Sequence, residues 1–429
     1  METINQRRLP TAEVEKLKTY LVDLVSREAE GKINEKVHFQ DKAREWVEMA
    51  YDQLNLNLEQ IQKELIIRDV LSELIGYGPL QSLLDDPDNN EVMVCGPSQI
   101  YVERHGKLEE VDIQFNSEAH LMRIINRILH PVGRHVNFDH PTSDARLPDG
   151  SRVNVVIPPV AIDGPNLTIR KFLRNMYSAE QFINMKSMTR HMVEFLKACV
   201  VARMNIIITG NTSSGKTTLL NILTGFIPGN ERIITIEDAA ELQLRQKFVV
   251  RLETRPANVD GLGAITTRDL VKNALRMRPD RLVVGEVRSG EALDMLQAMN
   301  TGHDGSLTTL HSNSPRDAIS RLETMTLMSG LDLPIKAIRA QIASAIDLIV
   351  HMDRLPDGTR KVVRITEVPR MEADMVTLSD LFTFDQTGVD RQGNILGEIK
   401  ATGLRPVFTQ RLEVAGFHLG ADVFGAGRS

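Results

Sequence analysis

The residues best suited to chemistry in this sequence lie in one short stretch, GNTSSGKTT. It contains two glycines, a lysine and six small polar residues: Gly210, Asn211, Thr212, Ser213, Ser214, Gly215, Lys216, Thr217 and Thr218. This spacing is that of a phosphate-binding loop, whose glycines let successive backbone N–H groups turn inward around an anion. The lysine of such a loop reaches the β and γ phosphates of a nucleotide, and the hydroxyl of Thr217 binds Mg²⁺. The sequence therefore predicts a nucleotide and Mg²⁺ as ligands.

The residues on either side of the loop favour the same reading. A β-branched run at 205 to 209 precedes it and predicts a strand, and the run KTTLLNILTGF follows it and predicts a helix. The positive end of that helix adds to the field that attracts phosphate. A glycine-serine loop that precedes a helix by chance is the alternative, and the agreement of strand, loop and helix argues against it.

Two apolar runs further along the chain end in acidic residues. The run at 233 to 236 leads to Glu237 and Asp238, and the run at 282 to 284 leads to Gly285 and Glu286. The carboxyl ends of parallel strands meet at the edge of a sheet where such sheets bind ligands, so we expect these acids near the loop. A solvated acid that caps a following helix remains an alternative, mainly for Asp238.

Two histidines, His303 and His311, flank a strand-like run in TGHDGSLTTLHSN. Their spacing suits neither a paired-histidine helix site nor a zinc site, because both cysteines are distant in sequence. Two readings stay open with equal weight. Each histidine is either a structural residue or a group that hydrogen-bonds the terminal phosphate.

Composition limits the function classes. The 429 residues carry 51 basic and 57 acidic side chains, a formal net charge of −6, which argues weakly against a general nucleic-acid binder. Two cysteines in so long a chain indicate a reducing compartment rather than a disulfide framework. The first residues lack the apolar region of a signal peptide, and no apolar run approaches the ~18 residues that span a bilayer. We expect a cytoplasmic protein.

The patterning predicts three parts. Apolar residues at helical spacing predict a helical unit over residues 1–75. Alternating strands and one helix, with Ser117 as its N-cap, predict an α+β domain over 76–177. Alternating helices and β-rich strands predict a wound α/β domain over 178–429.

Taken in order, GNTSSGKTT, ITIEDAAEL, LVVGEVR and TGHDGSLTTLHSN resemble the Walker A, Asp-box, Walker B and His-box motifs of the secretion-superfamily ATPases. The upstream stretches EVMVCGPSQIYVERHGKLEEV and DARLPDGSRVNVVIPPVAIDGPNLTIRKF are similar to the CpaF branch, which drives assembly of tight-adherence (Flp) pili. The similarity covers about residues 60 to 370. It implies a RecA-like P-loop ATPase domain preceded by an α+β (PAS-like) domain and a helical unit.

The resemblance also implies partners and a working state. It implies a homohexamer that hydrolyses ATP with Mg²⁺, rotates its domains against each other and acts on inner-membrane pilus platform proteins. Contact with the membrane would be through those partners, and no direct contact with nucleic acid is expected.

Residue roles follow from the resemblance at matching positions. Glu286 would orient the attacking water, and Glu237 and Asp238, with Glu241, would shape the Mg²⁺ and water environment. His303 and His311 would couple the phosphate state to neighbouring elements.

Three arginines of the second part complete the set. Arg152 and Arg170 match arginines that reach the phosphates, and Arg146 is a less certain companion. An arginine supplied by a moving element can accelerate phosphoryl transfer by ~10³ to 10⁵. The alternative is that these arginines form surface ion pairs on strands.

Two other functions remain open. One is a conjugation or type IV secretion ATPase that moves DNA or effector proteins, to which the net charge of −6 gives no support. The other is a scaffold that binds ATP without hydrolysing it, against which Glu286 argues.

Overall fold

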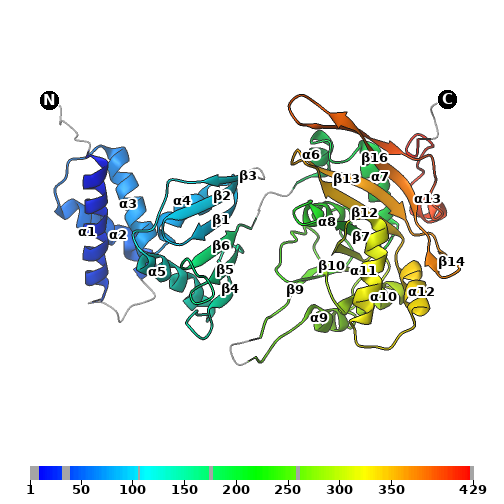
Figure 1. Ribbon diagram of the computed structural model, residues 1–429, viewed down its shortest axis with the longest axis horizontal. Helices are drawn as coiled ribbons and strands as arrows, with labels where there is room; N and C mark the ends of the chain where they lie inside the picture. Colours follow the sequence, from blue (N-terminus) through cyan, green and yellow to red (C-terminus); the bar gives the residue numbers. More distant parts are fainter. Residues whose placement is uncertain (1–8, 31–38, 105–106, 173–176, 258–260, 426–429) are drawn as a thin grey trace. The chain divides into compact units, whose positions relative to one another are not determined.

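The computed structural model describes residues 9–30, 39–104, 107–172, 177–257 and 261–425 (Figure 1). The chain divides into two compact units, Met1–Leu173 and Arg174–Ser429. Together they give a mixed α/β fold of helices and sheets. None of the helices in the described ranges combines the length and the apolar character that crossing a bilayer requires.

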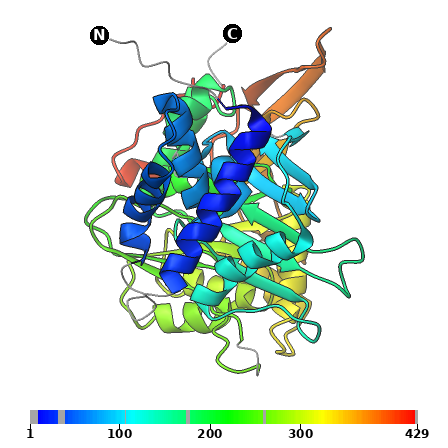
Figure 2. The ribbon, with the colours of Figure 1, turned by 90° about the vertical axis from the view of Figure 1, so that its left-hand side faces the viewer.

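The first unit begins with three helices that pack against one another, and Figure 2 shows them from the side. They are α1 (Thr11–Glu30), α2 (Phe39–Gln53) and α3 (Gln60–Leu74). Leu21 and Val25 of α1, Val47 of α2 and Ile66 and Val70 of α3 are fully buried and form one core. The four-residue spacing within α1 and within α3 places each pair on one face of its helix, so the helices must pack to bury it.

A six-stranded antiparallel sheet follows in the same unit, in the order β3-β2-β1-β6-β5-β4. The strands are β1 (Asn89–Cys95), β2 (Gln99–Arg104), β3 (Lys107–Glu110), β4 (Thr142–Arg146), β5 (Arg152–Val156) and β6 (Asn166–Arg170). The helical elements are η2 (Gly78–Leu80), α4 (Gln81–Asp85), α5 (Glu118–Leu129) and η3 (His130–Val132). Ser117 caps α5 as predicted, because its side chain accepts a hydrogen bond from the His120 amide. This part has the predicted α+β character.

The second unit is built on a nine-stranded sheet in the order β17-β16-β13-β12-β7-β11-β10-β8-β9. Neighbouring strands from β12 to β9 run parallel, and β13, β16 and β17 extend the sheet antiparallel. The strands are β7 (Ile206–Gly210), β8 (Ile233–Glu237), β9 (Val249–Glu253), β10 (Arg281–Val287), β11 (Leu307–His311), β12 (Leu348–Arg354), β13 (Arg360–Glu367), β16 (Ser379–Val389) and β17 (Ile395–Ala401). A separate hairpin joins β14 (Met371–Glu372) and β15 (Met375–Val376).

Helices cover both faces of this sheet (Figure 1). They are α6 (Ala179–Asn184), α7 (Arg190–Val201), α8 (Lys216–Thr224), α9 (Thr267–Ala274), α10 (Glu291–Asn300), α11 (Pro315–Leu327), α12 (Ile335–Ala345) and α13 (Thr409–Val414). Ile206 and Ile208 of β7 join the core of α7 and α8, while Ile207 joins the core of α9 to α12. Because both faces are covered, β7 is apolar along most of its length and every residue of it is buried.

The strands that carry the predicted site differ slightly from expectation. The strand expected at 205 to 209 is β7, displaced by one residue. The strand expected at 282 to 284 is β10, which continues through Glu286 to Val287. Glu286 therefore lies within β10 rather than after it, where the register of β10 against β11 shifts between Val284 and Val287.

Arg281 at the start of β10 is fully buried. Its guanidinium forms an ion pair with the buried Glu231 and donates to the Gly305 carbonyl at 3.2 Å. Burial lowers the pKa of Arg281, and the hydrogen bond with Glu231 opposes that shift. This pair is a polar element inside the sheet's core.

Replacing Arg281→Met should lower the free energy of unfolding of this unit by about 3 kcal/mol, because Glu231 keeps its burial and loses its main partner. Urea unfolding followed by circular dichroism measures the change. The double variant Arg281→Met, Glu231→Leu should recover part of the loss. A single-variant loss below about 1 kcal/mol would contradict the assignment.

Candidate active site

The predicted phosphate loop connects the carboxyl end of β7 to the first residue of α8. Its glycines are required by the backbone. Gly210 and Gly215 have φ of 148° and 99°, and a side chain at Gly210 would collide with the carbonyl oxygen of Met352. Ser213 also has a positive φ, 59°. Such a loop aims successive N–H groups at one point, as phosphate binding needs.

Two features of the loop suit a bound phosphate. The Ser214 hydroxyl is buried and makes no hydrogen bond. Gly215 stands at the N-cap position of α8 and has no side chain to cap the helix. Thr217 and Thr218 follow, half-buried, in the first turn. A buried donor without a partner is costly, so the loop fits an anionic ligand.

The side chain of Lys216 is buried and lies across the loop. Its ammonium donates to the carbonyls of Gly210 at 3.0 Å and Asn211 at 2.8 Å, and lies 3.4 Å from Nδ1 of His311. Two backbone carbonyls of the loop thus hold the Lys216 ammonium, the cation predicted to bind phosphate, within the loop.

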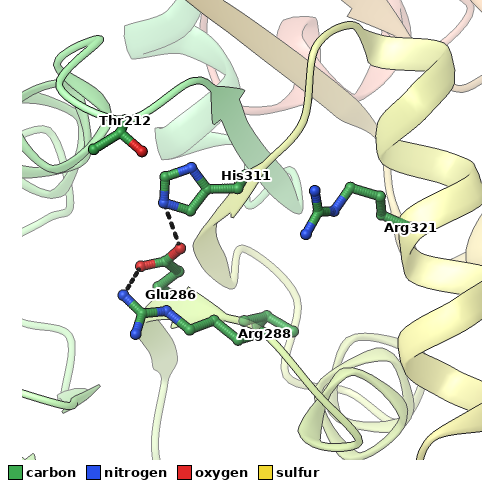
Figure 3. A pocket seen from close by; sticks show the side chains of 6 residues that line it. Thr212, Glu286, Arg288, His311 and Arg321 are labelled. Carbon is green, nitrogen blue, oxygen red and sulfur yellow. Dashed lines mark hydrogen bonds and ion pairs between the residues drawn. The ribbon is translucent and has the colours of Figure 1, made fainter.

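Glu286 lies between a histidine and an arginine (Figure 3). Its Oε1 is 2.9 Å from Nε2 of His311, and its Oε2 accepts a hydrogen bond from Nη2 of Arg288 at 2.6 Å. Oε1 is buried, and its contact with His311 lacks hydrogen-bond geometry. The carboxylate is therefore fixed through one oxygen while the other can still accept a hydrogen bond.

His311 joins the loop to Glu286. It ends β11, directly opposite Gly210 in the parallel register of β11 and β7. Burial lowers the pKa of His311, and the positive charge of Lys216 lowers it further. The imidazole is accordingly neutral near pH 7.

A pocket of ≈ 440 Å³ opens beside these groups. It is lined by Thr212, Glu286, Val287, Arg288, His311 and Arg321. Three of these are predicted site residues, and the arginines are additions. Arg288 follows Glu286 by two residues within LVVGEVR, so the motif itself could have drawn attention to it. Arg321 is on α11, and nothing in its local sequence distinguishes it.

The two predicted acids after β8 have different surroundings. Glu237 is buried, and its Oε2 accepts hydrogen bonds from the amides of Glu241 at 2.8 Å and Leu242 at 2.9 Å. Burial raises the pKa of Glu237. Asp238 is exposed, and its carboxylate is 3.4 Å from Nη1 of Arg288. Asp238 is therefore linked to Glu286 through Arg288. Glu237 instead binds backbone amides of the segment that follows β8.

The structure does not bring His303 to the phosphate loop of its own chain. His303 precedes β11, and Gly305 and Ser306 beside it bond to Asn205, the residue before β7. Because β7 and β11 are parallel, His303 lies at the amino edge of the sheet and the loop at the carboxyl edge. The spacing in TGHDGSLTTLHSN made the two histidines look equivalent, but a whole strand separates them.

The predicted arginines of the first unit form a row across three strands. Arg146 on β4 pairs with Arg152 on β5, and Arg152 pairs with Arg170 on β6. Paired residues of antiparallel strands project from the same face. Glu91 on β1 continues the row beside Arg170. The role of these arginines at the site stays a prediction.

The titration of His311 can be measured directly. Imidazole resonances followed by NMR should give a midpoint below the ordinary value of 6.5, because the cationic form loses hydration on burial and is repelled by Lys216. In Lys216→Met the midpoint should rise. A wild-type midpoint at or above 6.5 would contradict this description of the site.

Comparisons with known proteins agree with this geometry. The family model described as "Type II/IV secretion system protein" matches residues 73–389. VirB11, a type IV secretion system protein of Bartonella quintana, is 32% identical over 352 residues, which cover 73% of this chain and 96% of the relative. A Mycobacterium tuberculosis protein named for conjugal transfer is 35% identical over 312 residues, 71% of this chain and 88% of the relative.

Among solved structures, the VirB11 ATPase of Brucella suis is 29% identical and covers 68% of this chain and 93% of its own, with a TM-score of 0.38. The family model matches well over half of the chain. This chain therefore belongs to the Type II/IV secretion system protein family.

Proposed function

We propose that this protein is a motor that hydrolyses ATP with Mg²⁺ for a secretion or pilus system. The observation that carries the proposal is the carboxylate of Glu286. It lies at the sheet edge that bears the phosphate loop, it is held by Arg288, and its buried Oε1 makes no hydrogen bond. A carboxylate in this state is suited to orient water for attack on a terminal phosphate.

The loop residues 210 to 218 would hold the triphosphate through backbone N–H groups, and Lys216 would exchange its bonds with loop carbonyls for bonds with phosphate oxygens. Thr217 and Asp238 would hold Mg²⁺, which neutralises charge on the phosphate oxygens. Two protein ligands suffice because Mg²⁺ usually keeps several waters and binds phosphate as well.

In the reaction, the oxygen of water bonds to the γ phosphorus, and the bond from that phosphorus to the bridging oxygen breaks. ADP leaves with the bonding electrons, and the water gives a proton to Glu286 or to the phosphate. The contacts of Glu286 with Arg288 and His311 fix its direction throughout. Neutral His311 separates Lys216 from Glu286 without adding a charge.

We propose further that Arg152 and Arg170, with Arg146 beside them, supply positive charge to the phosphates. Their alignment on neighbouring strands supports this proposal. A planar guanidinium group can bind two phosphate oxygens at once. Contact that depends on movement of the first unit would couple hydrolysis to that movement.

The finer proposal is a homohexamer that powers assembly of Flp pili through an inner-membrane platform protein. Its support is the similarity of the stretches at 91 to 111 and 144 to 172 to the CpaF branch. We propose a cytoplasmic location and contact with the membrane through partners.

The second candidate is a conjugation or type IV secretion ATPase. The names of the relatives favour it, because they include VirB11 and proteins named for conjugal transfer. Deleting the gene and scoring surface filaments and DNA transfer separately distinguishes the two. A wild-type protein that binds ATP without turnover would instead indicate a scaffold.

Lys216→Ala should weaken ATP binding by at least about tenfold, because the loop loses its cation for the β and γ phosphates. Calorimetric titration with ATP measures the dissociation constant. Lys197→Ala, a change to an exposed lysine on α7, serves as the matched control. Equal dissociation constants for Lys216→Ala and the control would exclude this role of Lys216.

Glu286→Gln should keep ATP affinity and lower kcat by about 100-fold or more, because the amide orients water poorly and accepts no proton. Phosphate release gives kcat, and nucleotide titration gives the affinity. Glu194→Gln, on the exposed side of α7, should behave as wild type. Turnover at the wild-type rate in Glu286→Gln would remove Glu286 from the reaction.

A further inference from the structure

The pocket beside Glu286 contains a cation, Arg321, to which the proposed hydrolysis of ATP assigns no role. Figure 3 shows Thr212 of the phosphate loop at one side and Arg321 at the other, with His311 and Glu286 between them. Arg321 is presented by α11, whereas the loop, β10 and β11 supply the other lining residues. The pocket thus joins the loop to a cation on a separate element.

Arg321 has no anionic partner within the part of the chain that the structure describes. Glu323, two residues later on α11, forms an ion pair with Arg339. Asp317, one turn earlier, accepts a hydrogen bond from the Asn313 amide. Ala318 and Leu322 anchor α11 in the core. The guanidinium is therefore carried toward the pocket by a rigid helix and is not neutralised by an ion pair there.

The other charges of the pocket are already paired. Arg288 is held by Glu286 at 2.6 Å and lies 3.4 Å from Asp238. His311 is neutral near pH 7 because burial and Lys216 lower its pKa. The unbalanced charge in the lining is the positive charge of Arg321. A pocket of this kind favours a small anion, and a guanidinium fork matches a tetrahedral oxyanion.

We propose that Arg321 and Arg288 form a binding site for the orthophosphate that hydrolysis releases, next to the position of the terminal phosphate. The inference rests on the proposed ATP hydrolysis, because that reaction supplies the ligand. Thr212 of the loop and Glu286 both line the pocket, so the product forms next to it. ADP stays in the loop at residues 210 to 218 while orthophosphate occupies the pocket.

Such a site gives the cycle an intermediate with both products bound. Orthophosphate beside Glu286 competes with that carboxylate for Arg288. Departure of the product restores the Glu286–Arg288 pair that the structure contains. The site therefore affects product release. Binding of ATP depends on the phosphate loop and not on this site.

The test is product inhibition of the full chain by inorganic phosphate. Steady-state ATP hydrolysis is measured with increasing phosphate for wild type, Arg321→Gln and Arg321→Lys. Arg276→Gln is the matched control, because Arg276 is exposed and outside the pocket lining. The inhibition constant for phosphate should rise about tenfold in Arg321→Gln, less in Arg321→Lys and not in the control. The KM for ATP should change less than about twofold.

An unchanged inhibition constant in Arg321→Gln overturns the inference. So does a fall in kcat with an unchanged inhibition constant, which would place Arg321 at the transition state instead. Thermal melting checks that each variant is folded, and the charge-retaining Arg321→Lys serves if Arg321→Gln does not fold.

Absence of turnover in the wild type would refute the proposed function. Binding of inorganic phosphate to the pocket could still be measured directly. Inorganic phosphate then has to raise the melting temperature of ADP-loaded wild type and not that of ADP-loaded Arg321→Gln. Equal shifts in the two proteins would overturn the phosphate site by itself.

Discussion

The parallel register of β7, β11 and β10 is the constraint on which the site depends. It sets Gly210 opposite His311. A shift in the register of β10 against β11 between Val284 and Val287 includes Glu286, whose carboxylate lies 2.9 Å from His311. All three strands run in one direction, so their carboxyl ends share one edge of the sheet. Apolar burial on both faces holds this register, because a slip of one residue would reverse every side chain of β7.

The edge of the sheet carries a continuous series of polar contacts from Lys216 through His311, Glu286 and Arg288 to Asp238. Opposite charges alternate along it, apart from the neutral imidazole. Binding of an anion at Lys216 acts on one end of the series and binding at Arg288 acts on the other. In the proposed reaction, this series would let the state of the phosphate change the environment of Glu286.

The first unit contains a different electrostatic arrangement. Arg146, Arg152 and Arg170 occupy paired positions on neighbouring strands. The strand ladder sets the spacing of their backbones, and in the proposed function an anion would bind across this row. Preorganised cations of this kind stabilise developing charge more effectively than mobile ones.

The sequence by itself determined the local features. Glycine spacing defined the phosphate loop at 210 to 218, apolar periodicity defined the helices and strands around it, and the strand ending near Glu286 indicated the acid of the site. Only the tertiary structure decided which distant residues meet. It separated His303 from His311 by the length of β11, bound Glu237 to backbone amides and brought Arg321 of α11 to the pocket. The reason is that local propensity acts over a few residues, whereas these contacts depend on strand order and helix placement across the whole sheet.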